Sequence, residues 1–449
     1  MNIFKGIFGL LVFACVSGFS SLAFPQELAN DDIALYEDIV YTVVDGRKLK
    51  LDIAVPKYLR SPAPAIVDIP GGAWRKAEKK AGDALFYARH GFVGISITHR
   101  TSDIAVFPAA VHDCKTAVRW VRAHAEKYNI NPDKIGATGV SSGGHLATLL
   151  ATSGGDEYLE GKGGYWKYSS RVQAAVDHFG PTDFLQKTGD QQDAFSNADS
   201  PPALFLGGPL SEKADLARLA NPITYIDAND PPLLIVHGEK DGMVKISQSE
   251  ILFAALTHAK VPVKFIRVKN ADHMYHPYKW DEAISPTIDE LYEYTINWFE
   301  QWLGKPDIDY GSIPAKPQAR NGQAVQPVQL FYRLRIELPG KTEKSYCRGR
   351  FAIMCEGKTL AAGYISLPDL SSPEKRTFEK QITIAGVDLT NRLILWNFRG
   401  EVFDSEINEV IEPGQLQNEK YDKKIKGVGF DLMIGPDQSV QFTKKVFRD

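Results

Sequence analysis

Up to about Gly304, short apolar stretches alternate with longer amphipathic ones. Several of the apolar stretches have no polar face, which is typical of strands that are covered on both sides. The stretch Ala109–Tyr128 instead repeats its apolar residues every three or four positions, which predicts a helix. This alternation predicts an α/β fold with a mostly parallel sheet. The predicted strands are Ala65–Ile69, Phe92–Thr98, Lys134–Thr138, Val172–His178, Leu233–His237 and Val263–Val268.

A hairpin is predicted ahead of this sheet. The segments Ile39–Val44 and Leu49–Val55 flank Asp45-Gly46, a residue pair that favours a two-residue turn between antiparallel strands. Together, the hairpin and the alternating region place an α/β domain at residues 31–304.

The pattern changes after this domain. Four prolines and few apolar residues predict an extended linker over residues 305–327. Beyond it, apolar and polar residues alternate with a period of two in Tyr332–Leu338 and Val428–Ile434. We therefore expect a small β-rich accessory domain, a sandwich or a barrel, over residues 328–449. Turn-forming pairs separate its segments at Pro339-Gly340, Glu356-Gly357 and Gly435-Pro436.

The first residues have the features of a secretory signal. Lys5 precedes the apolar run Ile7–Val16, and Ser21-Leu22-Ala23 supplies small residues for cleavage after Ala23. A membrane anchor is the alternative, but the run is shorter than the roughly 20 residues that span a bilayer. We therefore expect residues 1–23 to be removed and the mature chain to be periplasmic or secreted, without a membrane span.

Composition and charge limit the classes of protein to which the chain could belong. The 449 residues are 44% hydrophobic and 24% charged, with a net charge of −3, so no basic field suggests a nucleic-acid partner. Cys114 lies in a helical pattern and is interpreted as a buried small hydrophobe. Cys347 and Cys355 could form a disulfide only if the chain reverses between them, and the sequence does not decide this.

The most informative motif is Gly139-Val-Ser-Ser-Gly143, which follows a predicted strand and precedes a helical pattern. A Gly-x-Ser-x-Gly sequence in that setting presents its serine on a tight, strained turn, which closes because the glycines lack side chains. The start of the next helix favours a developing negative charge. Ser141 is therefore the candidate nucleophile, and Ser142 is the rival hydroxyl.

With these residues the chain resembles α/β-hydrolases of the esterase–lipase group, from about Tyr36 to Leu303. It is similar to bacterial acetyl and feruloyl esterases and carries a kynurenine-formamidase-like pattern. The β-rich part lies outside the resemblance. The motifs that carry it are Ile69-Pro-Gly-Gly-Ala-Trp74, Phe107-Pro-Ala-Ala-Val-His-Asp-Cys114, Gly139–Ala147, Gly180-Pro-Thr-Asp183, Pro231–Asp241 and Ala271-Asp-His273.

The resemblance also implies where the oxyanion donors lie. Acyl transfer needs N–H groups aimed at the oxygen that becomes negative. The family has His-Gly-Gly where this chain has Pro70-Gly71-Gly72. Proline lacks an N–H, but the expected donors are the main-chain amides of Gly71 or Gly72 together with that of Ser142. A simple glycine turn is the alternative interpretation.

The acid and the base are expected after later strands. The family pattern places the acid at Asp241, with Glu239 as the alternative. The base should be an imidazole, because it must gain and lose a proton near neutral pH. His273 follows the last predicted strand, and His276 is the alternative. The order Ser141, Asp241, His273 matches the order that this fold uses.

These residues predict a serine carboxylic-ester hydrolase that works through an acyl-enzyme. Its substrates would carry acetyl or feruloyl-type groups on glycans or small esters, and the β-rich domain suggests a polysaccharide partner. Trp74, Tyr165, Trp166 and Tyr275 could line the pocket or simply pack, and residues 154–166 and 186–210 could cap it. No metal or cofactor is expected, because the metal-binding motifs His-Glu-x-x-His and Cys-x-x-Cys are absent.

Two other functions stay open. The same catalytic residues would serve an amide or peptide hydrolase of the arylformamidase or acyl-peptidase type, which would differ mainly in the shape of its pocket. A carbohydrate-binding protein with an inactive hydrolase domain is the third interpretation, because Pro70 departs from the family pattern.

Overall fold

The computed structural model describes residues 28–186, 197–279 and 282–313 in full. It also describes the backbone of eight strands between residues 328 and 448. The predicted signal at residues 1–23 lies outside the described residues. Among the residues that are described, no helix is both long enough and apolar enough to cross a bilayer.

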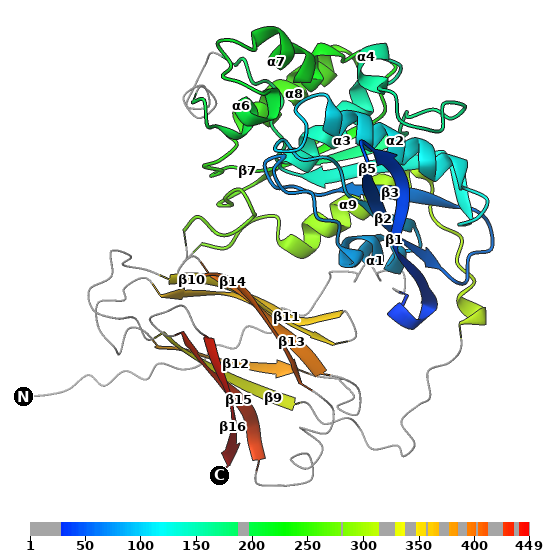
Figure 1. Ribbon diagram of the computed structural model, residues 1–449. Coiled ribbons are helices and arrows are strands. Elements are labelled where there is room, and N and C mark those ends of the chain that lie inside the picture. The colour runs from blue at the N-terminus through cyan, green and yellow to red at the C-terminus, as the bar shows by residue number, and fades with distance from the viewer. Residues whose placement is uncertain are drawn as a thin grey trace, which may run out of the picture.

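The α/β part is built on one eight-stranded sheet with the order β1-β2-β4-β3-β5-β6-β7-β8 (Figure 1). β1 and β2 are antiparallel, β2 is antiparallel to β4, and every later pair is parallel. The predicted mostly parallel sheet is therefore confirmed. Its strands are β1 Ile33–Val44, β2 Arg47–Pro56, β3 Ala63–Ile69, β4 Val93–Ile97, β5 Ile130–Val140, β6 Ala174–His178, β7 Leu233–Gly238 and β8 Val263–Val268.

The predicted hairpin is also confirmed. β1 and β2 pair from Val44 opposite Arg47, so Asp45 and Gly46 alone form the turn. Both have positive φ, at 48° and 76°. A two-residue turn with this handedness matches the twist of the strands that it joins, which explains why Asp-Gly is favoured here.

Helices cover both faces of the sheet (Figure 1). One apolar core lies between the sheet and α2, α3 and α8, with members such as Val118 and Leu149. A second core lies between the sheet and α9, around Val176 and Phe299. The described helices of four or more residues are α1 Ala81–Arg89, α2 Ala109–Ala123, α3 Ser142–Thr152, α4 Glu157–Glu160, α6 Pro201–Leu206, α7 Ala214–Ala220, α8 Ser247–His258 and α9 Ile288–Leu303.

Local signals fix the ends of some helices. α9 begins after Thr287, whose hydroxyl accepts from the amide of Glu290 while the Glu290 carboxylate accepts from the amide of Thr287. α2 ends at Ala123, five residues before the predicted end. The reason is a turn in which the Ile130 amide donates to the Ala125 carbonyl and starts β5 earlier than predicted.

The packed region extends past the predicted boundary at Gly304, which corrects the predicted linker. Leu59 and Ile308 form an isolated antiparallel bridge, and Arg60 lies 2.8 Å from a carboxylate oxygen of Asp309. Ile308 is only 7% exposed and belongs to a small apolar cluster that also contains Leu28. Residues 305–313 therefore form part of the α/β domain. Residues 314–327 lie outside the described part.

Eight strands follow, in two four-stranded sheets with the orders β11-β10-β13-β14 and β12-β9-β15-β16. How these sheets pack, as a sandwich or a barrel, stays a prediction. The three predicted turns at residues 339–340, 356–357 and 435–436 lie outside the described residues. The strands are β9 Val328–Ile336, β10 Cys347–Cys355, β11 Lys358–Leu367, β12 Thr377–Ile384, β13 Leu393–Gly400, β14 Phe403–Ile411, β15 Ile425–Ile434 and β16 Val440–Arg448.

The backbone decides the question of the Cys347–Cys355 disulfide. Both cysteines lie on β10, which runs from one to the other without reversing. At about 3.3 Å per residue its ends lie about 26 Å apart, whereas a disulfide needs Cα atoms within about 7 Å. The two residues therefore cannot bridge each other. Cys114, in contrast, is buried with a free thiol in α2, as the sequence predicts.

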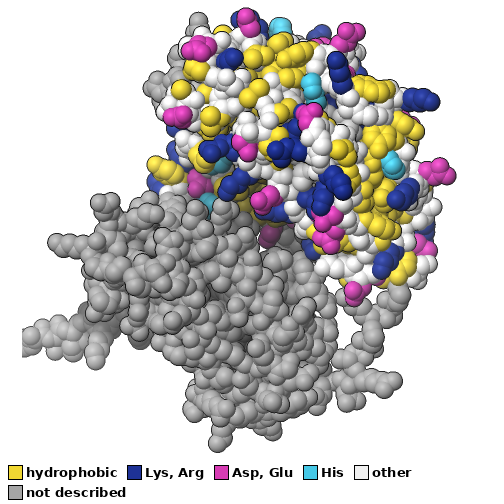
Figure 2. Space-filling view, viewed as in Figure 1, with side chains coloured by type: hydrophobic (Ala, Val, Ile, Leu, Met, Phe, Trp, Pro, Cys, Tyr) yellow, Lys and Arg dark blue, Asp and Glu magenta, His cyan; other side chains and the backbone are white. Residues whose placement is uncertain are grey.

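Charge is mixed on the face of the α/β domain that Figure 2 shows, where acidic and basic side chains are interspersed. No large region of that face carries charge of one sign only. This agrees with the small net charge of −3 for the whole chain. A charge distribution of this kind gives no electrostatic attraction for a polyanion such as DNA over the whole visible surface.

Candidate active site

Ser141 lies on a sharp turn between β5 and α3. Its φ and ψ are 54° and −121°, a backbone conformation that is costly for any residue with a side chain. The turn is closed from one side by the end of β3, because a Cβ atom on Gly143 would overlap the main-chain oxygen of Ile69. The strained turn and the glycine beside it are the features that the Gly-x-Ser-x-Gly motif predicts.

The three predicted catalytic side chains meet at the carboxyl ends of the parallel strands. His273 Nε2 lies 3.0 Å from Ser141 Oγ, and His273 Nδ1 lies 2.7 Å from Asp241 Oδ2. Both distances are those of hydrogen bonds. In this arrangement Nδ1–H donates to the carboxylate, so Nε2 carries the lone pair that can accept the serine proton.

Asp241 is buried and held on both oxygens. The amides of Met243 and Val244 donate to Oδ1 at 2.8 and 2.9 Å, while His237 Nε2 lies 3.1 Å from Oδ2. Burial would raise the pKa of this carboxyl, but the hydrogen bonds from His237 and His273 outweigh it and lower the pKa to about 2. The carboxylate is therefore ionised at every pH at which the imidazole could work.

Further residues fix the acid and the base. His237 lies 2.8 Å through Nε2 from the Val244 carbonyl and 2.7 Å through Nδ1 from Ser249 Oγ, so its ring is held at both nitrogens. The ring of Phe179 lies 4.7 Å from that of His273, centroid to centroid. These contacts restrict the rotation of the carboxylate and the imidazole, as a preformed site requires.

The rival residues lie elsewhere. Ser142 Oγ is buried and has no hydrogen-bond partner among the described atoms. Glu239 is exposed at the end of β7. His276 lies 3.3 Å from Asp272 instead of facing the nucleophile. The geometry thus brings Ser141, Asp241 and His273 together and leaves each alternative outside the hydrogen-bonded chain.

The loop after β3 lies beside the nucleophile turn. A Cβ atom on Gly71 would lie 2.6 Å from the main-chain oxygen of Val140, so only glycine fits there. Gly72 has a φ of 136°, a conformation that residues with side chains rarely adopt. Ser142 opens α3, where main-chain N–H groups have no partner within the helix. The backbone that would supply the predicted oxyanion donors is therefore adjacent to Ser141.

Trp74 and Tyr275 lie mainly in the core. Trp74 is 3% exposed, stacks on Phe205 at 4.6 Å and donates from Nε1 to His145 Nδ1 at 3.3 Å. The Tyr275 hydroxyl donates to the Val236 carbonyl at 3.1 Å. These positions favour the packing interpretation over pocket lining. Trp74 directly follows Gly72 and Ala73, so its packing anchors the loop that holds the predicted oxyanion donors.

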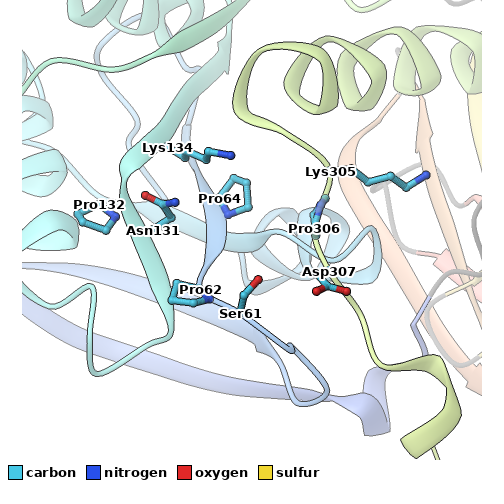
Figure 3. Close-up of a pocket in the computed structure, with 9 residues that line it drawn as sticks. All are labelled: Ser61, Pro62, Pro64, Asn131, Pro132, Lys134, Lys305, Pro306 and Asp307. Atoms are coloured by element: carbon cyan, nitrogen blue, oxygen red, sulfur yellow. The ribbon is translucent and has the colours of Figure 1, made fainter.

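A separate cavity of about 370 Å³ lies at the opposite edge of the sheet, near the amino ends of β3 and β5 (Figure 3). It is distant from the catalytic side chains, which lie at the carboxyl ends. We therefore do not assign it to the site. Among the described residues, no group of three or more His, Cys, Asp or Glu is placed to hold a metal ion. The cavity is lined by Ser61, Pro62, Pro64, Asn131, Pro132, Lys134, Lys305, Pro306 and Asp307.

Sequence reasoning missed the supports of this site. It did not pair His237 with Asp241, whose carboxylate the ring of His237 contacts directly. It did not identify the amides of Met243 and Val244 as donors to Asp241. A signal for these was present, because an aspartate before a tight turn often accepts from amides two and three residues further on.

Comparisons with known proteins show what the α/β domain is similar to. Residues 51–256 match the BD-FAE family model. Esterase LipQ of Mycobacterium tuberculosis is 32% identical over 217 residues, which are 47% of this chain and 50% of LipQ. The chain thus spans about half the length of the curated relatives that it matches.

Two solved structures are similar as well. A truncated form of a carbohydrate esterase from gut microbiota is 31% identical, with a TM-score of 0.53, over 62% of this chain and 100% of that one. A bifunctional GH43-CE protein of Bacteroides eggerthii is 33% identical, with a TM-score of 0.50, over 62% of this chain and 39% of that one. The chain therefore belongs to the esterase family of α/β-hydrolases.

Proposed function

We propose that this protein hydrolyses carboxylic esters through an acyl-enzyme on Ser141. The observation that carries the proposal is the continuous hydrogen-bonded chain from Ser141 Oγ through His273 to the buried, ionised Asp241. Each link has the length that proton transfer or orientation requires. The esterase relatives support the same chemistry.

The reaction divides into two steps. First, His273 Nε2 takes the Ser141 proton while Oγ attacks the ester carbonyl carbon, and the same proton then passes to the departing alcohol. The acyl group is left on Oγ. In the second step His273 takes a proton from water, the resulting hydroxide attacks the acyl carbon, and the proton returns to Oγ as the carboxylic acid leaves. Asp241 stabilises the imidazolium in both steps.

The tetrahedral intermediates carry a negative oxygen. We assign its stabilisation to the main-chain amides of Gly71 or Gly72 and of Ser142, which lie on the two backbone segments that meet beside Ser141. Loss of one such donor in serine hydrolases lowers the rate by about 10²- to 10³-fold. Pro70 is compatible with this role, because its own missing N–H is not one of the donors.

We further propose that the ester groups are acetyl or feruloyl-type groups carried by glycans. A carbohydrate esterase and a bifunctional GH43-CE protein are among the similar structures, which supports a carbohydrate substrate. The apolar run and small residues near the start of the chain support removal of residues 1–23 on export, to the periplasm or outside the cell.

The test compares the chain with its Ser141→Ala variant. The purified protein should hydrolyse p-nitrophenyl acetate and release acetate from acetylated xylan, and Ser141→Ala should lower the turnover number by at least about 10⁴-fold. Ser142→Ala keeps its main-chain amide and serves as the matched variant, with most activity retained. Full turnover by Ser141→Ala would exclude the proposed nucleophile. Faster cleavage of aryl amides than of esters would favour an amide hydrolase instead.

A further inference from the structure

A loop on the flank of the α/β domain is held at its base by buried ion pairs and a hydrogen bond between its ends. We call residues Glu160–Ser170 the aromatic loop. Its two ends are joined, because Ser170 Oγ donates to Glu160 Oε1 at 2.6 Å. Between them runs Lys162-Gly-Gly-Tyr-Trp-Lys-Tyr168, a sequence rich in aromatic and basic residues that the catalytic mechanism does not use.

The base of the aromatic loop is fixed to α2 by two buried cations, and α2 and α4 lie side by side in Figure 1. Lys115 Nζ lies 2.9 Å from Glu160 Oε1, and Arg119 Nη1 lies 2.6 Å from Glu160 Oε2. The side chains of these cations are 0% and 1% exposed. Removing two cations from water is costly, so the arrangement persists only because Glu160 and nearby carbonyl oxygens satisfy them.

Two glycines let the loop lie flat against α2. A Cβ atom on Gly161, whose φ is 66°, would overlap the ring of His112, and one on Gly163 would overlap the hydroxyl of Thr116. Any other residue at these positions would require the loop, or the side chains of His112 and Thr116, to move. The backbone near the base is thereby pressed onto α2. Tyr165 packs partly against the core, while Trp166 and Tyr168 are exposed.

The tip presents aromatic rings to solvent. Trp166 is 57% exposed and Tyr168 is 41% exposed. The inner face of the Trp166 ring lies over the Arg119 guanidinium, 4.7 Å from its centroid. Because Arg119 is itself fixed by Glu160, the indole is held in place while much of its surface remains open to solvent. A large exposed ring held in this way loses little freedom when a ligand stacks on it.

Positive charge flanks these rings. Lys162 and Lys167 are exposed, and neither forms an ion pair within the described residues. The aromatic loop therefore combines stacking surfaces with cations that are not neutralised, a combination that suits an anionic ligand with flat apolar faces.

The aromatic loop lies away from the chemistry. α2 starts after the carboxyl end of β4, on the same edge of the sheet as Ser141, and Arg119 lies ten residues after its first residue, Ala109. At about 1.5 Å per residue this places the Trp166 contact about 15 Å along the helix from that edge. A ligand bound there would not touch the catalytic side chains, so the prediction that residues 154–166 cap the pocket is not met at Trp166.

From these observations we infer that the aromatic loop binds a polysaccharide that carries uronic acid residues. The C–H faces of sugar rings would stack on Trp166 and Tyr168, and the sugar carboxylates would pair with Lys162 and Lys167. The choice of a glycan over other polyanions rests on the proposed function, in which the ester groups are carried by a polysaccharide. The loop would then hold the polymer while one of its ester groups reaches Ser141.

The test uses the full-length Ser141→Ala variant, which cannot turn over a substrate. The probe is an oligosaccharide of xylan substituted with glucuronic acid, compared with an unsubstituted xylo-oligosaccharide. Lysines are acetylated with an N-hydroxysuccinimide ester and quantified by peptide mass spectrometry. The acidic oligosaccharide should protect Lys162 and Lys167 more than the neutral one does, and it should leave the exposed Lys48 unprotected.

A second variant assigns the binding to the tip. Trp166→Ala should weaken the affinity for the acidic oligosaccharide about tenfold by calorimetry. Trp302→Ala, which removes a 38% exposed tryptophan from α9, should leave it unchanged. Intact folding of both variants is checked by their urea unfolding transitions.

Three results would overturn the inference. The first is that the acidic oligosaccharide does not change the labelling of Lys162 and Lys167 and that Trp166→Ala does not change its affinity. The second is stronger protection by single-stranded DNA than by the glycan. The third is that, without any sugar, Lys162 and Lys167 become less labelled as the protein concentration rises. This would identify a second copy of the chain as the occupant. Since binding is measured without turnover, failure of the proposed esterase function would be seen separately, as inactivity of the unmutated protein.

Discussion

Among single residues, Asp241 shows how its surroundings set a protonation state. Its pKa is about 2 in the folded chain, against an ordinary value of 3.8, since the hydrogen bonds from His237 and His273 outweigh the effect of burial. A carboxyl group whose pKa is lower in the folded chain than in the unfolded chain stabilises the fold at pH values above its unfolded pKa. That stability is lost as the pH falls through the folded pKa, here between about 4 and 2.

Asp241→Asn should therefore change the pH dependence of stability. The amide cannot ionise, so the free energy of unfolding of the variant should fall less between pH 6 and pH 2 than that of the original chain. The expected difference is about 2 kcal/mol, read from urea unfolding at each pH. Asp215→Asn is the control, because that carboxylate is 97% exposed. An identical pH dependence for Asp241→Asn would contradict the assigned pKa.

The three residues of the proposed catalytic site could be predicted because each follows a strand that the local pattern reveals. Ser141, Asp241 and His273 come directly after segments whose apolar runs or glycine spacing are visible within a few residues. The contact between His237 and Asp241 was not predictable in the same way. The sequence places both residues on one strand and the turn that follows it. Whether their side chains meet depends on how that turn packs against α8.

At the level of elements, the site depends on how closely the end of β3 approaches the nucleophile turn. Gly143→Ala should disturb both the end of β3 and the nucleophile turn. The Cβ of the new alanine would overlap the main-chain oxygen of Ile69, which cannot rotate away. We expect a loss of stability of about 2 kcal/mol. The turnover number should fall at least tenfold, because the loop after β3 that holds the proposed donors Gly71 and Gly72 is displaced.

The control for this variant is Gly82→Ala in α1, where an added Cβ meets no atom within 4 Å. Alanine in a helix is favoured over glycine by about 0.5–1 kcal/mol, so this variant should be slightly more stable and fully active. The two variants are compared by thermal unfolding and by p-nitrophenyl acetate hydrolysis. If Gly143→Ala matched Gly82→Ala in both assays, the close approach of β3 would have no functional role.

The junction of α2 with α4 gives a second prediction for an element. Glu160→Gln removes the carboxylate that pairs with both Lys115 and Arg119 and leaves two cations buried. Breaking a buried ion pair from one side is strongly destabilising, and we expect a loss of about 3 kcal/mol in the free energy of unfolding. Glu157→Gln, an exposed residue of the same short helix, should change it little.

Most elements of the α/β domain could be predicted from periodicity alone, but the burial of particular charged side chains could not. Lys115 and Arg119 lie on α2, where the sequence pattern marks the helix but gives no sign that these cations are buried. Their burial comes from the chain after α3, which folds back over α2 and brings Glu160 with it. No pattern within α2 carries that information.

For the whole molecule, the informative error is the end of the catalytic domain. Prolines and polar residues after Gly304 resemble a linker, yet Ile308 returns to a cluster formed by Leu28 and Ile33. A single isoleucine among polar residues gives a weak signal in the sequence. Its importance appears only when the distant segment that it covers is known.

Truncation tests this boundary. A chain ending after Gly304 loses Ile308, exposes the cluster that it covers and removes the carboxylates that pair with Arg60. Burying one isoleucine contributes about 2–3 kcal/mol, so this chain should unfold at a lower temperature than one ending after Ile313. Ile308→Ala in the full chain should reproduce most of the loss. Equal unfolding temperatures for the two truncated chains would restore Gly304 as the end of the domain, with residues 305–313 as linker.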